Sequence, residues 1–173
     1  VTPFPDSFSY WGQGYVFNVI PVPAVLMVIT FAIFYFLSTR TVFGRSVYSV
    51  GGNEEASRLS GISVGRTRIL VFAISGLMAA LGGIITSSRI MAGSHSVGEG
   101  LEFDVIAAVV IGGTSLAGGA GSMIGTFLGV IFIGLLNNGM VLMGVDPYWQ
   151  EVARGLIVLA AVGETITEKS GMI

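Results

Sequence analysis

Cysteine is absent from this chain of 173 residues, histidine occurs once, and charged residues make up only 10% of the total. Without cysteine the chain has no disulfide, no thiolate nucleophile and no thiolate metal ligand. The single histidine, His95, leaves no Ser/His/Asp or Cys/His catalytic set, so nothing points to an enzyme. The formal net charge of -2, with no basic patch outside one loop, gives no support for nucleic-acid binding.

Apolar residues, in contrast, are abundant: they make up 53% of the chain, and the mean hydropathy is +0.84. Soluble domains carry roughly 25% charged residues. The composition therefore predicts an all-α polytopic membrane protein, because helices satisfy their own backbone groups in lipid. The sequence opens on Val1 with no basic segment and no cleavage site, so we expect no signal peptide and a piece of a longer protein.

Three uncharged apolar stretches, 16–37, 69–87 and 123–145, reach the length of about 20 residues that a spanning helix needs. Residues 1–15 precede them as an outer-side segment. Five of the eight basic residues lie in the loop 38–68, which the positive-inside rule places in the cytoplasm. In the second span, small residues at four-residue spacing predict close helix contact: Ser75, Ala79 and Gly83.

The stretch 105–117 is harder to interpret, because its length of about 20 Å as a helix falls short of a hydrocarbon core of about 30 Å. It is either a short span or a half-helix broken at Gly112 and Gly113. We predict that it crosses, which places the C-terminus inside. The other assignments are a periplasmic loop at 88–104, a Gly-rich turn at 118–122, a last span at 148–162 and an atypical polar tail at 163–173 that does not complete it.

Within the basic loop, the sequence specifies both ends of a short helix at 54–60. Asn53 is a favourable N-cap, and Glu54 and Glu55 occupy the first turn, where carboxylates meet the positive end of the helix dipole. Gly61 followed by apolar Ile62 is typical of a Schellman motif. A helix of two turns is unstable alone, so we expect partner contacts. An ordinary capped loop helix is the alternative.

Glycines dominate the sequence GGTSLAGGAGS at 112–122. A phosphate-binding loop would need a following Gly-Lys-Ser/Thr, which is missing, so we favour a tight connection between packed helices. Gly121, Gly125 and Gly129 continue this pattern as a ridge for close helix packing.

Polar side chains at two places leave alternatives open. Glu99, Glu102 and Asp104 form an acidic cluster that is a solvated face, a contact for an external partner or a metal site. Asn137 and Asn138 lie inside a span, where an amide either bonds to another helix or lines a substrate path.

In order along the chain, GRSVYSVGGNEEASRLSGI, FDVIAAVVIGGTSLAGGAGSMIGTFLG and LLNNGMVLMGV resemble the permease subunit of bacterial ABC importers of the ribose and xylose type. The resemblance implies the C-terminal half of a permease with about ten spans in the bacterial inner membrane. It also implies four partners: a second permease copy, a cytoplasmic ABC ATPase, a periplasmic sugar-binding protein and membrane lipid. The chain itself would hold no cofactor or metal, since ATP-Mg would bind the ATPase.

The resemblance also assigns residues. It implies a coupling helix for the ATPase formed by Gly52, Asn53, Glu54, Ala56, Arg58, Leu59, Ser60 and Gly61. It suggests a translocation path at Gly112, Gly113, Thr114, Ser115, Asn137 and Asn138, and contact with the binding protein at Glu99, Glu102 and Asp104. The chain departs from the family at Ala120, where members commonly carry a basic residue, and in its tail.

Two other functions fit a membrane protein of this kind. Half of an ion-coupled secondary transporter would have similar broken helices, but predicts a charged residue within a span, and the three long spans contain none. A structural scaffold without a path would leave the capped cytoplasmic helix unexplained. The sugar itself is not specified by the sequence.

Overall fold

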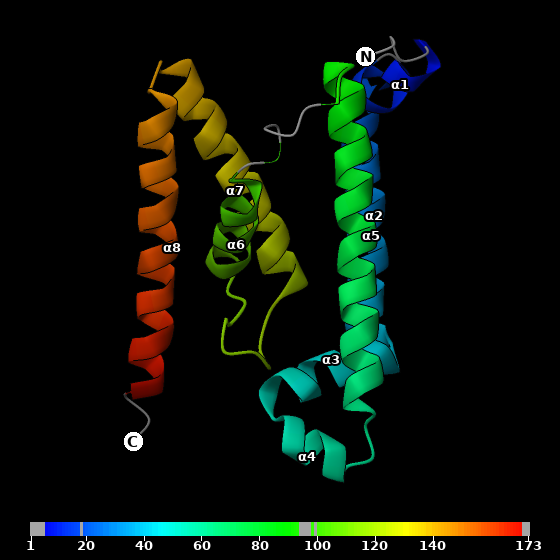
Figure 1. Cartoon of the computed structure of the whole chain (residues 1–173), viewed down its shortest axis with the longest axis vertical. Coiled ribbons are helices and arrows are strands. Elements are labelled where there is room, and N and C mark those ends of the chain that lie inside the picture. The colour runs from blue at the N-terminus through cyan, green and yellow to red at the C-terminus, as the bar shows by residue number, and fades with distance from the viewer. Residues whose placement is uncertain (1–5, 18, 94–97, 99, 171–173) are drawn as a thin grey trace.

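The computed structural model describes residues 6–17, 19–93, 98 and 100–170, and the described part is an all-α membrane protein with one small ribbon of two strands (Figure 1). The helices are α1 (Asp6–Gln13), α2 (Val22–Arg40), α3 (Val42–Gly52), α4 (Glu54–Leu59), α5 (Val64–Ile90), α6 (Leu101–Ile111), α7 (Met123–Leu142) and α8 (Pro147–Ser170). The antiparallel strands are β1 (Tyr15–Val16) and β2 (Ile20–Pro21).

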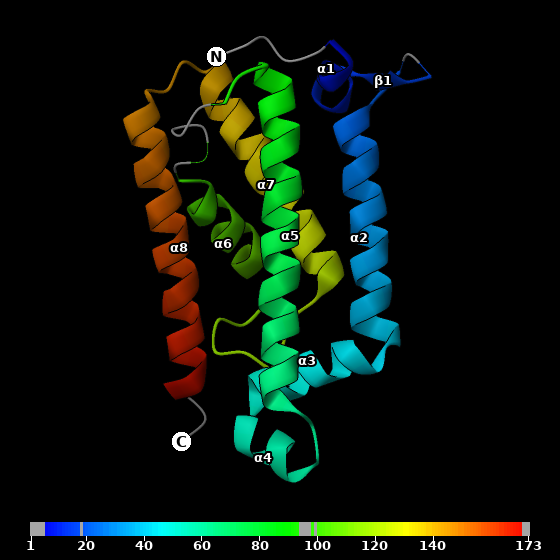
Figure 2. The same ribbon diagram turned by 45° about the vertical axis from the view of Figure 1, so that its right-hand side comes forward.

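Helices α2, α5 and α7 are each long and apolar enough to cross a bilayer. Together with α8 they run along the long axis of the molecule, with α1 and the strands at one end and α3 and α4 at the other (Figures 1 and 2). The basic residues of 38–68 all lie at the α3 and α4 end, which we call the inner end; the opposite end is the outer end.

A helix that the sequence reading did not anticipate, α3, occupies part of the loop 38–68. Thr41 makes the turn from α2 into α3, because its hydroxyl accepts a hydrogen bond from Gly44 N at 3.2 Å as the N-cap. Gly44 is buried, and a Cβ there would collide with the carbonyl of Ser38 at the end of α2. The chain can therefore fold back sharply only with glycine at this position.

At the outer end, part of the predicted outer-side segment 1–15 is helical, and the prolines near the start of the predicted span 16–37 delay its regular helix. Residues 6–13 form α1, the strands β1 and β2 pair Tyr15 with Pro21, and the spanning helix starts only at Val22. Helix α1 packs against the end of α5, where Gln13 Nε2 donates to Arg89 O at 2.8 Å. The hydroxyl of Ser88 donates to Phe8 O. The first span and α5 are thereby joined at the outer end.

Helix α6 begins at Leu101, within the predicted loop 88–104, and ends at Ile111 just before the glycine pair. It covers 11 residues, about 16 Å, so it spans only about half of a hydrocarbon core. The non-helical segment 112–122 continues toward the inner end before α7 returns (Figures 1 and 2). A half-helix followed by a glycine-rich loop thus leads from the outer end toward the inner end.

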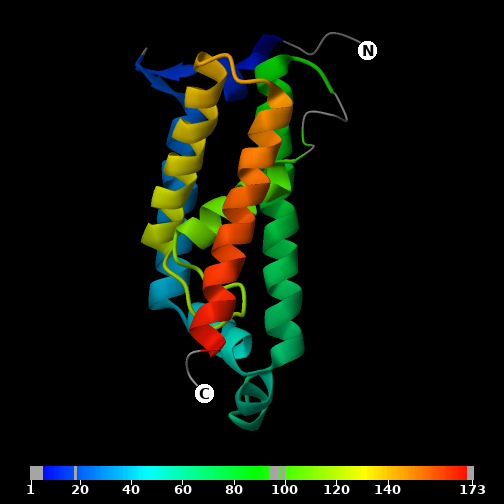
Figure 3. The ribbon, with the colours of Figure 1, turned by 90° about the vertical axis from the view of Figure 1, so that its left-hand side faces the viewer.

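The predicted last span at 148–162 proves to be longer in the structure. Helix α8 covers 24 residues and continues through 163–170, so this part of the tail is helical, contrary to the expected break. It runs from the outer end to the end occupied by α4 (Figure 3). Polar residues are compatible with a helix wherever it leaves the membrane.

Candidate coupling site and membrane path

Helix α4, which is the predicted coupling helix, has the two helix ends that the sequence specifies. Asn53 Oδ1 accepts from Ala56 N at 2.9 Å as the N-cap. At the other end, Gly61 N donates to Arg58 O and Ile62 N to Ser57 O, both at 3.0 Å. This pair of bonds is a Schellman motif, and Gly61 supplies its left-handed residue with φ +80°.

The side of α4 that faces the protein is polar. Ser57 is 2% exposed, and its hydroxyl lies 2.8 Å from the hydroxyl of Ser49 on α3. Asn53 N donates to Ser49 O at 3.0 Å, which joins the two helices through the backbone. Thus α4 has contacts within its own chain that fix it on α3.

The opposite side of α4 is open to solvent. Leu59 is 85% exposed, and Ala56 and Arg58 are exposed beside it. Glu54 connects this side of α4 to α5, because its carboxylate lies 3.6 Å from Arg58 Nη2 and 2.7 Å from Arg68 Nη2. An exposed leucine next to an arginine, on a helix held from behind, is a surface suited to a protein groove.

Two glycine pairs meet directly behind α4. Gly51 and Gly52, the last residues of α3, lie against Gly118 and Gly119 in the loop between α6 and α7. Gly118 and Gly119 have φ of +88° and +78°, a conformation that favours glycine. The predicted Gly-rich turn is therefore a contact with the coupling region as well as a connection between helices.

Of the three glycines in the predicted packing ridge, Gly121 differs from Gly125 and Gly129 in what surrounds it. A Cβ at Gly125 or Gly129 would overlap the carbonyl of Gly112 or Ala108, so α6 and α7 touch backbone to backbone at both positions. A Cβ at Gly121 would meet only the side chain of Thr114 in its own loop. The helix contact is thus carried by Gly125 and Gly129, around a small core that includes Ala107, Ala108 and Ile133.

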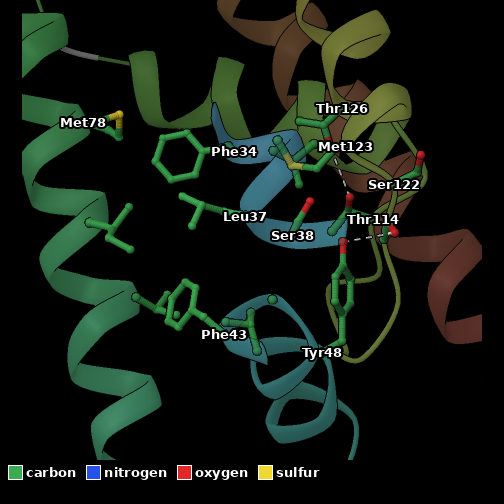
Figure 4. A pocket seen from close by; sticks show the side chains of 16 residues that line it. Phe34, Leu37, Ser38, Phe43, Tyr48, Met78, Thr114, Ser122, Met123 and Thr126 are labelled. Atoms are coloured by element: carbon green, nitrogen blue, oxygen red, sulfur yellow. Dashed lines mark hydrogen bonds between the residues drawn. The ribbon is translucent and has the colours of Figure 1, made fainter. Parts of the chain in front are cut away.

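A cavity of about 480 Å³ lies at the inner half, between α2, α3, α5 and the loop (Figure 4). Figure 4 shows Phe34 and Leu37 pointing from α2 toward Met78 on α5. The hydroxyls of Tyr48, Thr114 and Thr126 lie across from them; those of Thr114 and Thr126 are 3.2 Å apart. The lining is mostly apolar with a few hydroxyl groups. Of the predicted path residues, Thr114 borders this cavity.

A second cavity of about 640 Å³ lies nearer the outer end, between α5 and α6. Ser75, Ala79 and Gly83 line it, with Thr86 and Ser87 beyond them. A Cβ at Gly83 would meet nothing within 4 Å. The small residues of α5 therefore face open space in this chain, and the expected helix contact is not made there.

Two members of the predicted acidic cluster, Glu102 and Asp104, lie among the described residues, and they have different surroundings. Glu99 lies outside the described residues, Glu102 is exposed on α6, and Asp104 faces α7. Asp104 Oδ2 accepts a hydrogen bond from Asn137 Nδ2 at 3.1 Å, whereas Asn138 is exposed on another side of α7. The two asparagines thus do not act together, and Asn137 joins helices.

The contribution of α3 is the part of the site that the sequence reading missed. Its side chains Phe43, Val47 and Tyr48 border the inner cavity. Two signals were present: Thr41 as an N-cap, and apolar residues at the four-residue spacing of a helix face at Phe43 and Val47.

Comparison with known proteins gives a consistent set of relatives. The chain is 53% identical to the probable ABC transporter permease protein YphD of Escherichia coli over 83% of its length. It is 48% identical to the ribose import permease protein RbsC of Bacillus subtilis over 90% of its length, and 52% identical to the xylose transport system permease protein XylH of Escherichia coli over 83%. It covers 43%, 48% and 36% of those proteins, less than half of each. No solved structure matches the chain.

The family profile described as branched-chain amino acid transport system / permease component matches residues 1–173, the whole chain. Its spanning helices and its relatives make the chain a multi-pass protein of the bacterial inner membrane. Two of these relatives, RbsC and XylH, are named as ribose and xylose permeases, which agrees with the resemblance seen in the three sequence stretches. The chain belongs to this family of ABC transporter permease components.

Proposed function

We propose that the chain is the C-terminal half of a permease subunit in an ATP-driven importer, and that α4 couples it to a separate ATPase. The observation that carries the proposal is the structure of α4. This helix of 6 residues is capped at both ends, fixed from behind by Ser57, and presents Leu59 at 85% exposure at the inner end. A surface of that kind is complementary to an apolar groove with a charged rim.

The two cavities are the basis for a translocation path. The inner cavity and the outer cavity both border α5, and Met78 lines both of them. An importer needs access to each side in turn, which rocking of α5 against its neighbours would provide. ATP-Mg would bind the partner ATPase, and closure of the ATPase would move α4.

The cargo we propose is a monosaccharide similar to ribose or xylose. No Asp, Glu, Lys or Arg is among the described residues that line either cavity, whereas several hydroxyls are. A zwitterionic amino acid would need counter-charges when it leaves water, but a neutral polyhydroxyl solute needs hydrogen-bond partners. The names of the relatives favour the same class.

A periplasmic binding protein would deliver the sugar at the outer end, where Glu102 is exposed on α6. A second permease copy would complete the path, as in a symmetric assembly. We infer the binding protein and the second permease copy from the family of the chain and from the proposed direction of transport.

The test uses the full-length permease expressed with its ATPase and binding protein. We expect Arg58→Glu and Gly61→Pro to abolish both ATPase co-purification and sugar uptake, since the first reverses a charge on the exposed side and the second breaks the Schellman motif. Arg66→Glu is the matched control, because it reverses an exposed charge in the first turn of α5, outside α4. Wild-type uptake in both α4 variants would refute the coupling role.

A further inference from the structure

The contact between the two glycine pairs is closer than any side chain would allow. A Cβ on Gly51 would lie 2.9 Å from Gly119 N, and one on Gly119 would lie 2.5 Å from Gly52 Cα. A Cβ on Gly118 would overlap the carbonyl oxygen of Gly51. Real Cβ atoms do not approach other atoms so closely, so α3 and the loop meet here backbone against backbone.

The loop that carries Gly118 and Gly119 is held together from within. Ser115 N donates to Ala120 O at 3.0 Å, and Gly118 N donates to Ser115 O at 3.1 Å. A second link to α3 lies beside the glycines, where Tyr48 Oη donates to Gly121 O at 3.4 Å. Figure 4 shows the Tyr48 ring reaching from α3 to the loop. The loop is thus attached to α3 at two adjacent places.

The loop is also fixed to the helices on either side of it. The backbones of Gly112 and Gly125 touch, as do those of Ala108 and Gly129, so α6 and α7 are packed without intervening side chains. The Thr114 and Thr126 hydroxyls, 3.2 Å apart, connect the start of the loop to α7. Because packed interiors resist deformation, α6, the loop and α7 would move as one hairpin.

On the other side of the contact, α3 and α4 are joined by the Ser49–Ser57 hydroxyl pair at 2.8 Å and the bond from Asn53 N to Ser49 O. Residues 60–63 join α4 to α5, and the side-chain link between these helices, the Glu54–Arg68 pair, is exposed; such pairs contribute about 0–1 kcal/mol. A displacement of α4 therefore reaches the glycine contact through α3 as well as reaching α5 along the chain.

We propose that the contact of Gly51 and Gly52 with Gly118 and Gly119 is the joint through which α4 moves the α6–α7 hairpin, and with it the wall of the inner cavity. The glycines act as positioning residues: they touch no substrate, but keep α3 and the loop close enough to move together. This inference rests on the proposed function, since it assumes that an ATPase displaces α4.

The test compares alanine variants in the full-length transporter with its ATPase and binding protein. Gly51→Ala adds a Cβ where the contact is closed, whereas Gly65→Ala adds one in a helix with nothing within 4 Å. Gly118→Ala is matched by Gly144→Ala, because both glycines have positive φ, +88° and +70°, and only Gly118 is in the contact. Sugar uptake, ATPase co-purification and basal ATP hydrolysis are measured for each.

We expect Gly51→Ala and Gly118→Ala to retain the ATPase and to hydrolyse ATP, while uptake falls by about 5- to 150-fold relative to the matched controls, the range typical of coupling between sites. Uptake equal to the controls would overturn the proposal. If Gly51→Ala does not assemble, Gly118→Ala decides, since it substitutes no residue of α3 or α4. Failure of Gly118→Ala to assemble would also overturn it, because the contact would then serve assembly. Loss of ATPase binding by the unmodified protein would instead refute the proposed function.

Discussion

Asn137 on α7 donates a hydrogen bond to the carboxylate of Asp104 on α6, with 3.1 Å between Nδ2 and Oδ2. The two residues are 33 positions apart in the chain, and the bond joins the outer part of the half-helix to the following span. Both side chains are half-buried, where a polar group is costly unless it is hydrogen-bonded, so this pair matters more for holding the hairpin than a surface pair would.

Removing one partner of this pair is expected to destabilise more than removing both. Asp104→Leu or Asn137→Leu removes this hydrogen bond from a half-buried polar group, which costs about 1–3 kcal/mol, whereas the double variant removes both groups. Thermal unfolding of the purified full-length protein in detergent measures this. Asn138→Leu is the control, since that asparagine is exposed. Additive losses in the double variant would contradict the pairing.

Gly129 is expected to tolerate no side chain. Gly129→Ala would push a methyl group against the carbonyl of Ala108 and separate α6 from α7, at a cost of about 1–3 kcal/mol. Gly134→Ala, on the same helix with nothing within 4 Å, should be neutral or slightly stabilising. The melting temperatures of the two variants provide the comparison, and equal values would show that the helices do not touch at Gly129.

At the end of α4, the left-handed conformation of Gly61 determines which substitutions are tolerated there. Gly61→Val should weaken ATPase association more than Gly61→Asn, because a branched residue pays a penalty of about 1–2 kcal/mol in this conformation while Asn tolerates it. Nothing lies within 4 Å of a Cβ at Gly61, so backbone conformation alone separates the two variants. Co-purification with the ATPase gives the result; the reverse order would argue against the Schellman motif as the cause.

Two polar contacts of α4 should differ in how much they stabilise the helix. Arg68→Gln removes an exposed ion pair, and we expect a loss below about 1 kcal/mol. Ser57→Leu places a larger side chain where the serine is 2% exposed, with an expected loss of about 1–3 kcal/mol. Hydrogen exchange of the α4 amides distinguishes them: faster exchange should appear in Ser57→Leu and little change in Arg68→Gln. A larger effect from Arg68→Gln would mean that α5 is the main support of α4.

The position of the end of α8 provides a topology test. Helix α8 ends at the same end of the molecule as α3 and α4 (Figures 1 and 3), so a reporter fused after the last residue of the full-length permease should be active in the cytoplasm. A reporter active only in the periplasm would mean that the α6 segment turns back instead of crossing. The same fusion after α4 serves as the inner reference.

Local features were predictable from the sequence because they depend on a few neighbouring residues. The cap at Asn53 and the left-handed Gly61 each act within one helical turn, and the long apolar runs define α2, α5 and α7 by composition alone. The start of α2 at Val22 follows from the proline pair nearby, which fixes the backbone of the first turn.

Features that depend on distant partners were not predictable. The charge of Asp104 led to its assignment to a loop, whereas it lies in α6 and its hydrogen-bond partner Asn137 is on another helix. The glycines at 51–52 and at 118–119 are both visible in the sequence, but nothing there shows that they meet. Helix α3 was not predicted, because the basic residues around it led to the assignment of the whole of 38–68 to a loop.

The half-length helix α6 also bears on how the protein enters the membrane. With 11 residues followed by a non-helical loop, this segment is too short to partition into lipid alone, whereas α7 has 20 residues and enters readily. Biogenesis would then require the two to leave the translocon together as a helical hairpin. The glycines at 125 and 129, which bring the two backbones into contact, would act during synthesis as well as in the finished transporter.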